Sequence, residues 1–347
     1  MFDQNIKRIG FACKFLHGDQ SLPKKFLTEA QGIYNTRTTT AQWLRNQPRA
    51  VAEQRLREIM QHNIQSFFNL VDYVATLPAN QRMVRLSSDC LPMYTHPEWR
   101  YFWQQTAQQL YCAKYLGAVG AHARANDVRL SMHPGQFVCL GSNNADVVSR
   151  SIEEFEYHAD LVRWMGYGTV FQDFKINVHI SGRQGPAGIK AVIPRLSTVA
   201  RNCITIENDE NRWGIDDSIE LAEHCALVFD CHHHWVRDGD YLQSTDDRYK
   251  RIVDSWRGVR PAMHYSLSRE DILVDHCANT LPDRDALIAA GTKRGKLRAH
   301  SDMMWNTAAN DYVLQFLEFS DIMIEAKSKN LASTALYNYA VETGVIT

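Results

Sequence analysis

The sequence predicts a closed (β/α)8 TIM barrel. Eight short runs of β-branched and aliphatic residues alternate with longer stretches of helical spacing, and eight is the strand count of the closed parallel barrel. No glycine-rich phosphate loop follows the first run, although an open doubly wound sheet commonly carries one. No low-complexity tract or Pro/Gly/Ser linker interrupts the 347 residues. We therefore expect residues 1–347 to form a single domain.

The elements follow in chain order. The expected strands are 8–13, 83–87, 128–132, 175–180, 203–207, 226–230, 259–265 and 321–325. Apolar residues at helical spacing predict helices over 53–77, 101–125, 151–166, 217–224 and 308–319. The stretch from about 266 to 305 is long for one connection. We expect it to form a loop over the active-site mouth, where long functional loops tend to lie.

Composition limits the class of protein. The chain is 45% hydrophobic and 22% charged, which is ordinary for a globular protein. A net charge of −1 gives no global sign of nucleic-acid binding, although a local basic groove would suffice. The eight cysteines form no CxxC pair and are expected to be buried free thiols. The opening residues lack a signal peptide and no run is long enough to cross a membrane, so we expect a cytoplasmic protein.

Residues that can bind metal occur at most of the expected strand ends. They are His133, His179, Glu207, Asp230, His264 and Glu325. In a parallel barrel these ends face one mouth, so the side chains should converge. Imidazole and carboxylate without thiolate suit Zn²⁺, Mn²⁺ or Fe²⁺. A carboxylate such as Glu207 can bridge two ions, and multinuclear sites of this kind hydrolyse phosphodiesters.

Each of these residues has an alternative interpretation. A single histidine on a strand is most commonly a hydrogen-bonded core residue, and a strand-end glutamate is commonly solvated. Six such histidines and carboxylates at one barrel mouth, however, are unfavourable to bury unless they bind a metal ion or hydrogen-bond to one another. Within the run at 231–234, Asp230 and His233 are the expected ligand pair, with His232 and His234 as supporting or surface groups. His96 and His300 fall in predicted loops and could be solvated.

Two segments suggest contact with a substrate. Lys293, Arg294, Lys296 and Arg298 precede His300. In isolation they indicate a solvated charge run, and beside a metal site they could contact phosphate. Gln136 and Phe137 follow His133, and an amide beside an aromatic ring could wedge into stacked bases. Phe137 could equally pack its own loop.

Taken together, these motifs resemble the UV damage endonuclease family. The motifs are MHPGQF, NVHISG, IENDE, DCHHH, the strand with His264, AH at 299–300 and IEAKSK, and the resemblance runs from GFACK through the eighth strand. It implies a barrel related to the apurinic-site endonucleases that use three metal ions. It also implies nicking of damaged double-stranded DNA 5′ to a UV photoproduct, leaving 3′-hydroxyl and 5′-phosphate ends. Two or three divalent ions are implied, with Mn²⁺ favoured and Zn²⁺ or Fe²⁺ as alternatives.

The resemblance also implies roles for single residues. The implied metal ligands are His96, His133, His179, Glu207, Asp230, His233, His264, His300 and Glu325, with Glu207, His179 and His264 as catalytic residues. The implied DNA contacts are Gln136, Phe137, Phe11, Asn208, Lys293, Arg294 and Lys327. No obligate protein partner and no membrane are implied.

The chain departs from the family pattern at four positions. Phe11 and Phe137 stand where tyrosine is common, and Phe15 stands in place of an asparagine. Ala262 stands where some members have a lysine that is carboxylated at the metals, so no such ligand can form at this position. The ligands are kept while substrate-side residues differ, so the resemblance bears more on metal chemistry than on the lesion recognised.

Three alternative functions stay open. A barrel isomerase or epimerase acting on a sugar also binds divalent metal with His, Glu and Asp at strand ends, but would not need the basic residues at 293–298. A related nuclease would act on a different damaged or modified base. A DNA-binding repair accessory would have lost catalysis, and an incomplete ligand set would favour it.

Overall fold

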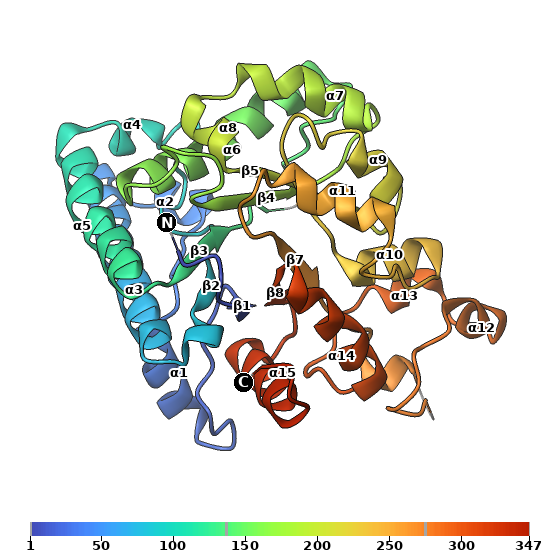
Figure 1. Cartoon of the computed structure of the whole chain (residues 1–347). Coiled ribbons are helices and arrows are strands. Elements are labelled where there is room, and N and C mark those ends of the chain that lie inside the picture. The colour runs from blue at the N-terminus through green and yellow to red at the C-terminus, as the bar shows by residue number, and fades with distance from the viewer. Residues whose placement is uncertain (1, 136–137, 274–275, 347) are drawn as a thin grey trace.

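Eight parallel strands form the centre of the computed structural model, which describes residues 2–135, 138–273 and 276–346 (Figure 1). The strands are β1 (Ile9–Ala12), β2 (Met83–Leu86), β3 (Arg129–Met132), β4 (Lys175–His179), β5 (Ile204–Glu207), β6 (Ala226–Val228), β7 (Ala262–Tyr265) and β8 (Asp321–Ile324). Their order is β6-β5-β4-β3-β2-β1-β8-β7. A single bridge between Asp230 and His264 joins the two outer strands. The predicted barrel is confirmed.

All eight strands lie where the sequence predicts them, with shifts at their ends. The seventh begins at Ala262 rather than at 259. Pro261 has no N–H to donate to a ladder, although its carbonyl accepts from the Asp321 N–H (2.9 Å). The sixth ends at Val228 because Asp230 leaves the sheet to cap the next helix.

Helices surround the strands (Figure 1). They are α1 (Lys24–Gly32), α2 (Ala41–Arg45), α3 (Arg49–Ala75), α4 (Arg100–Trp103), α5 (Thr106–Ala125), α6 (Ala145–Trp164), α7 (Gly185–Val192), α8 (Thr198–Cys203), α9 (Ile215–Ile219), α10 (Cys231–Asp238), α11 (Asp247–Ser255), α12 (Arg284–Ala289), α13 (Arg294–Leu297), α14 (Thr307–Leu314) and α15 (Lys329–Glu342). The first three predicted helices correspond to α3, to α4 with α5, and to α6. The predictions at 217–224 and 308–319 are too long, because α9 and α14 are shorter and a 3₁₀ turn, Gln315–Glu318, follows α14.

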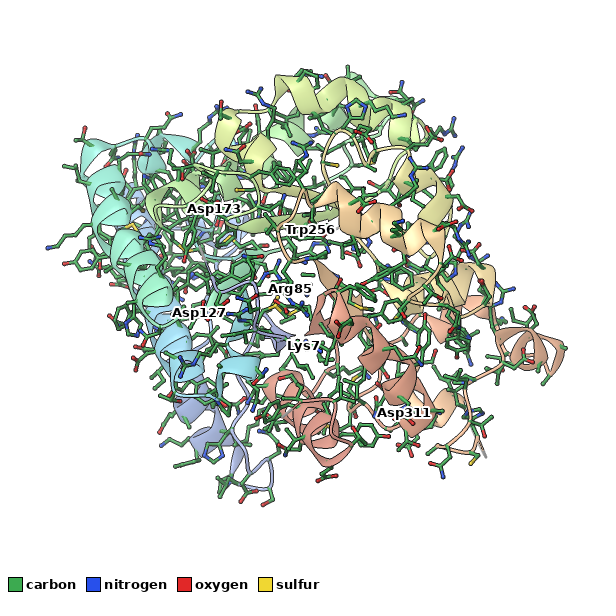
Figure 2. The ribbon with its side chains drawn as sticks, in the orientation of Figure 1. Lys7, Arg85, Asp127, Asp173, Trp256 and Asp311 are labelled. Carbon is green, nitrogen blue, oxygen red and sulfur yellow. The ribbon has the colours of Figure 1, made fainter. Side chains whose placement is uncertain are left out.

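Alternation along the strands separates two environments. One set of side chains packs against the helices in a large apolar cluster, and Phe11, only 1% exposed, belongs to it. Phe11 therefore lies beneath the helices, away from any substrate surface. The alternate set faces the barrel interior and is partly charged, with Arg85 near the centre (Figure 2). Phe15 packs against Tyr34 and Tyr73 in the loop after β1.

A buried carboxylate closes the lower end of the barrel. Asp321, fully buried, accepts from the backbone N–H of Arg8 (2.9 Å), from Nη1 of Arg129 (2.7 Å) and from Nε of Arg260 (2.7 Å). Arg129 also lies over the ring of Trp256. Charges in this position are tolerated because every carboxylate oxygen has a cationic partner.

The segment from 266 to 305 contains a 3₁₀ turn (Glu270–Ile272) besides α12 and α13. Its two ends meet at an antiparallel bridge between Ser268 and His300. Leu273 and Leu297 pack against Trp235 of α10, so apolar contacts hold the segment to the barrel.

Two further sequence expectations concern the chain as a whole. Five of the eight cysteines are buried free thiols, whereas Cys13 and Cys139 are partly exposed and Cys277 is exposed, so burial was predicted wrongly for these three. In the described part of the chain, no helix combines the length and apolar character that crossing a membrane requires.

Removing the buried carboxylate of Asp321 should destabilise the barrel strongly. Asp321→Ala leaves buried guanidinium groups unpaired, and breaking such a buried pair costs about 3–5 kcal/mol. Urea unfolding measures this loss. Glu318→Ala, which breaks an exposed pair with Lys7, is the control and should hardly shift the midpoint. Equal effects of the two variants would contradict the role assigned to Asp321.

His158 should make stability depend on pH. Burial lowers the pKa of His158 to about 4, and its Nδ1 donates to the carbonyl of Glu154. Between pH 4 and 6.5 the unfolded chain therefore binds more protons, so the free energy of unfolding falls as the pH falls. In His158→Gln this slope should decrease by up to about 1.4 kcal/mol per pH unit. Urea unfolding at pH 5, 6 and 7 tests it, with exposed His224→Gln as control. An unchanged slope in His158→Gln would refute the prediction.

Candidate metal centre

Imidazole and carboxylate side chains converge where the strands end. Four overlapping groups have ligand atoms within 4.8 Å of one another. Their members are His133, His179, Glu207, Glu210, Asp230, His233, His264 and Glu325. Seven of these eight are among the ligands that the sequence predicts. They come from the ends of β3, β4, β5, β7 and β8, from the loop after β5 and from the β6–α10 junction.

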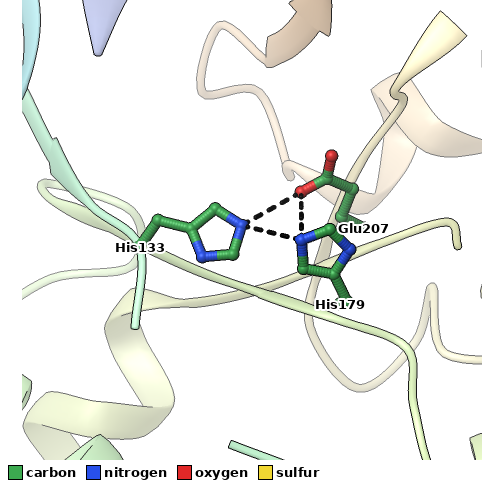
Figure 3. A group of neighbouring side chains, drawn as sticks. All are labelled: His133, His179 and Glu207. Carbon is green, nitrogen blue, oxygen red and sulfur yellow. Dashed lines mark hydrogen bonds and ion pairs between the residues drawn. The ribbon is translucent and has the colours of Figure 1, made fainter. Parts of the chain in front are cut away.

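One group joins three neighbouring strands (Figure 3). Nε2 of His133 lies 3.1 Å from Nε2 of His179 and 3.5 Å from Oε2 of Glu207. Nε2 of His179 lies 4.0 Å from the same carboxylate oxygen. Two ring nitrogens and one carboxylate oxygen therefore face a common point, which is the arrangement that a cation requires.

His264 forms the opposite side of the centre. Its Nδ1 lies 3.0 Å from Oε1 of Glu207 and 3.2 Å from Oε1 of Glu325. Its Nε2 lies 2.7 Å from Nζ of Lys175, below the centre. Arg85 pairs with Glu325, so this carboxylate has a fixed orientation.

The turn from β6 into α10 places Asp230 and His233. Oδ1 of Asp230 caps α10 by accepting from the backbone N–H of His233 (2.8 Å). The side-chain amide of Asn208 pairs with both the backbone N–H and the carbonyl of Asp230 (2.9 Å each). The Asn208 carbonyl lies 3.0 Å from Nδ1 of His233. Asn208, which the resemblance makes a DNA contact, is thus buried and occupied in holding these two residues.

Burial determines the charge of several groups. It lowers the pKa of His179 and the pKa of His264 to about 4, which keeps both rings neutral near pH 7. Burial also raises the pKa of Glu207, but the nearby His264 and His179 outweigh it and the net pKa lies well below the usual range. The pKa of Glu325 is likewise low, because Arg85 and His264 outweigh the effect of burial. Neutral imidazoles beside ionised carboxylates form a ligand set for a divalent cation.

His233 is the exception among the rings. Burial lowers the pKa of His233, but Asp230, Glu207 and Glu210 outweigh it and raise the pKa to about 10. Burial raises the pKa of Glu210, yet His233 outweighs it and the net value is about 2. Without a cation, a proton on His233 thus offsets part of the negative charge of the surrounding carboxylates. A bound cation would replace that proton.

An orphaned oxygen supports a metal at this place. Oδ2 of Asp230 is buried and, within the described residues, accepts no hydrogen bond. A buried carboxylate oxygen without a donor is costly unless a cation occupies the space before it. The residues present therefore fit divalent metal.

Sequence reasoning missed three side chains that touch the centre. Glu210 belongs to one of the four groups and pairs with Arg298. It lies in the motif IENDE, three residues after Glu207, but follows a strand end rather than forming one. Asn177 donates to Glu207, and Lys175 contacts His264. These two precede His179 at two-residue spacing, which was the available signal.

The structure does not bring every predicted ligand into the four groups. His96 lies in the loop after β2, where its Nδ1 accepts from the backbone N–H of Glu98. His300 is half-buried beside His232, with ring centroids 5.7 Å apart, and burial lowers its pKa. His232 and His234 are both buried, so neither is a surface group. His232 contacts Ser266 and Ser268, and His234 pairs with Asp238 and Asp240.

The expected DNA contacts are dispersed around the mouth. Lys293 is exposed at the start of α13, and Arg294 donates to the carbonyl of Glu210 (2.7 Å). Lys327, after β8, pairs with Asp302. Gln136 and Phe137 lie outside the described residues.

Comparisons with known proteins identify relatives. The sequence model of the family described as UV-endonuclease UvdE matches residues 8–343. A protein of Acanthamoeba polyphaga mimivirus, provisionally named a UV-damage endonuclease, is 31% identical over 274 residues, 76% of this chain and 76% of its own. The UV DNA damage endonuclease of Clostridium perfringens is 25% identical over 268 residues, 75% of this chain and 58% of its own.

Among solved structures, the crystal structure of SacUVDE is similar with a TM-score of 0.72 and 21% identity. The match covers 98% of this chain and 100% of that chain. At this identity the likeness bears on the fold, and it agrees with the barrel described above.

Metal should stabilise the folded chain measurably. A ligand at 100 times its Kd adds about 2.7 kcal/mol to the free energy of unfolding. Zn²⁺ should therefore raise the Tm of EDTA-stripped protein. Asp230→Asn should lose most of this rise while keeping the helix cap, since an amide oxygen still accepts from His233 N–H. Asp302→Ala removes an exposed carboxylate outside the four groups and should behave as the unmodified chain. Differential scanning calorimetry with and without Zn²⁺ decides, and equal Tm values for stripped and loaded protein would contradict a metal site.

Proposed function

This chain belongs to the UV-endonuclease UvdE family, and from this membership we propose that it is a metal-dependent DNA repair endonuclease. It would hydrolyse a phosphodiester 5′ to a UV photoproduct or another lesion in double-stranded DNA. The observation that carries the proposal is the set of eight imidazole and carboxylate groups gathered at one barrel mouth. A site for a single structural ion would need about half as many ligands.

The ligand set suggests how the residues divide the work. His133 and His179 face one oxygen of Glu207, while His264 and His233 face the other, so we propose that this carboxylate bridges two ions. Bound divalent ions would lower the pKa of an attacking water and stabilise charge on the phosphoryl oxygens. The chain itself keeps the rings of His179 and His264 neutral by burial, and it fixes Glu207 through Asn177 and Glu325 through Arg85. The ends produced would be a 3′-hydroxyl and a 5′-phosphate.

We propose that Mn²⁺ is the working metal, in two or three copies, with Zn²⁺ or Fe²⁺ as alternatives. The residues of the four groups suffice for more than one ion, and hard carboxylates beside imidazoles suit Mn²⁺. His300 would join as a further ligand after a small movement of the segment that carries it. His96 would reach the centre only if its loop shifts.

The DNA would lie across the mouth. We propose that Lys293, Arg294 and Lys327 contact its phosphates, because they lie on segments that border the metal centre. Gln136 and Phe137 would probe the bases. The segment from 266 to 305 would cover one side of the site, since Arg294 and Arg298 both contact Glu210.

Glu207→Gln should abolish cleavage while the barrel stays folded. The amide keeps the shape of the side chain but removes the bridging charge, and loss of several kcal/mol of charge stabilisation lowers the rate by roughly 1,000-fold or more. A nicking assay on UV-irradiated duplex with Mn²⁺ measures the rate, and circular dichroism checks the fold. Surface Glu220→Gln, whose carboxylate pairs with Lys190, is the matched control. Nicking by Glu207→Gln at the normal rate would rule out the bridging role.

The choice of substrate separates the alternatives in the same assay. UV-irradiated, abasic and undamaged duplexes are each incubated with Mn²⁺ or with EDTA. Metal-dependent nicking of the irradiated duplex alone supports the proposal, and preference for another lesion supports a related nuclease. Absence of metal-dependent cleavage of any duplex would favour a sugar isomerase or an inactive DNA-binding protein.

A further inference from the structure

A lysine lies buried in the barrel interior beneath the metal centre. Lys175, the first residue of β4, is 3% exposed. Its Nζ lies 2.7 Å from Nε2 of His264. Within the described residues this is its sole hydrogen bond, and no carboxylate oxygen lies within 4.0 Å of the amine. The amine therefore has one specific partner, and that partner is an imidazole of the metal centre.

A lysine buried in this way destabilises the folded chain relative to an apolar side chain of the same size. A buried amine loses its hydration, and an apolar side chain of similar length would pack in the same volume at lower cost. The charged groups that act on it electrostatically are Glu207, Glu325, Arg85 and Arg129. Its position is thus unfavourable for stability alone, which indicates a role tied to the group that it touches.

The lysine is one of three inward side chains on a single strand. Lys175, Asn177 and His179 are two residues apart, so they point the same way. Asn177 donates to Glu207, and His179 lies beside His133 in the centre. Strand β4 therefore contributes one member of the centre and two supports below it. Lys175 reaches across the interior, because β4 and β7 are not neighbours: β5 and β6 separate them on one side of the barrel and β3, β2, β1 and β8 on the other.

The small residue below His264 leaves this place to the lysine. Ala262 lies two residues before His264 on β7 and is buried, so its side chain ends at Cβ on the same face of the strand. It offers His264 no polar partner. When Nδ1 binds metal, the ring proton lies on Nε2, and Nε2–H would donate to the lone pair of the unprotonated Lys175 amine on β4.

We propose that Lys175 is a positioning residue that holds the imidazole of His264 with Nδ1 directed into the metal centre. A rotation of the ring by half a turn would exchange its two nitrogens, and the contact at Nε2 opposes that exchange. This keeps Nδ1 at 3.0 Å from Glu207 and 3.2 Å from Glu325. The inference rests on the metal centre of the proposed function and adds a residue that acts on it through His264.

The experiment measures metal binding without DNA. Lys175→Met keeps the length of the side chain and removes the contact, and Lys190→Met, at a partly exposed lysine that pairs with Glu220, is the control. Competition with a chromophoric chelator gives the affinity for Zn²⁺, and the Tm of metal-free protein reports the fold. Loss of a group that orients a metal ligand commonly weakens binding by about 10–100-fold. We expect this loss in Lys175→Met at an unchanged or higher metal-free Tm, and wild-type affinity in the control.

A second measurement uses the unmodified chain, so the inference stays testable if Lys175→Met does not fold. In Zn²⁺-loaded protein with ¹⁵N-labelled histidine, the His264 signal, assigned with His264→Gln, should show Nδ1 as the metal-bound nitrogen. Coordination through Nε2, or wild-type Zn²⁺ affinity in Lys175→Met, would overturn the inference. Both readouts are independent of nicking. Metal binding without cleavage would therefore defeat the proposed function and leave this inference standing.

Discussion

The site depends on the interaction between the buried carboxylate of Glu207 and the imidazoles that surround it. It is fully buried at the end of β5, and each of its oxygens faces imidazoles from a different side of the barrel. A carboxylate in this position is stable only because cationic or hydrogen-bonding groups surround it. Asn177 meets this requirement by donating to Glu207 from below, and imidazoles such as His133 and His264 meet it from the sides. The centre is therefore a set of groups whose pKa values depend on one another.

The barrel supports this centre by separating two kinds of core. Side chains facing the helices are almost entirely apolar, and they supply the burial that holds the fold together. Side chains facing the interior are charged at both ends, with Asp321 and its arginine partners below and the imidazole and carboxylate groups above. The interior also holds a small apolar cluster of Ala12, Met83 and Met323, but the much larger outer cluster supplies most of the hydrophobic burial. This division accommodates a phenylalanine at position 11, where the resemblance implies a tyrosine, because the ring of Phe11 belongs to the apolar layer.

The strands and most of the centre could be predicted from the sequence because both depend on local pattern. Apolar runs marked each strand, and His133, His179, Glu207 and Glu325 stood at strand ends that topology brings together. Short helices such as α7 and α8 could not be predicted, because so few residues show no clear helical spacing of apolar side chains. The roles of Glu210 and Lys175 could not be predicted for another reason. They depend on contacts across the barrel, which the spacing of residues along one strand does not indicate. Burial of His234 depended on the path of α10.

The junction between β6 and β7 has a consequence for how the molecule opens. Every other neighbouring pair of strands shares a ladder, whereas these two are joined by one bridge, between Asp230 and His264. Both residues belong to the same ligand group. The weakest strand junction of the barrel therefore lies between two members of the metal centre. Opening at this junction would part Asp230 from His264, and hydrogen exchange at the amide of His264, which donates to the Phe229 carbonyl, would report on it.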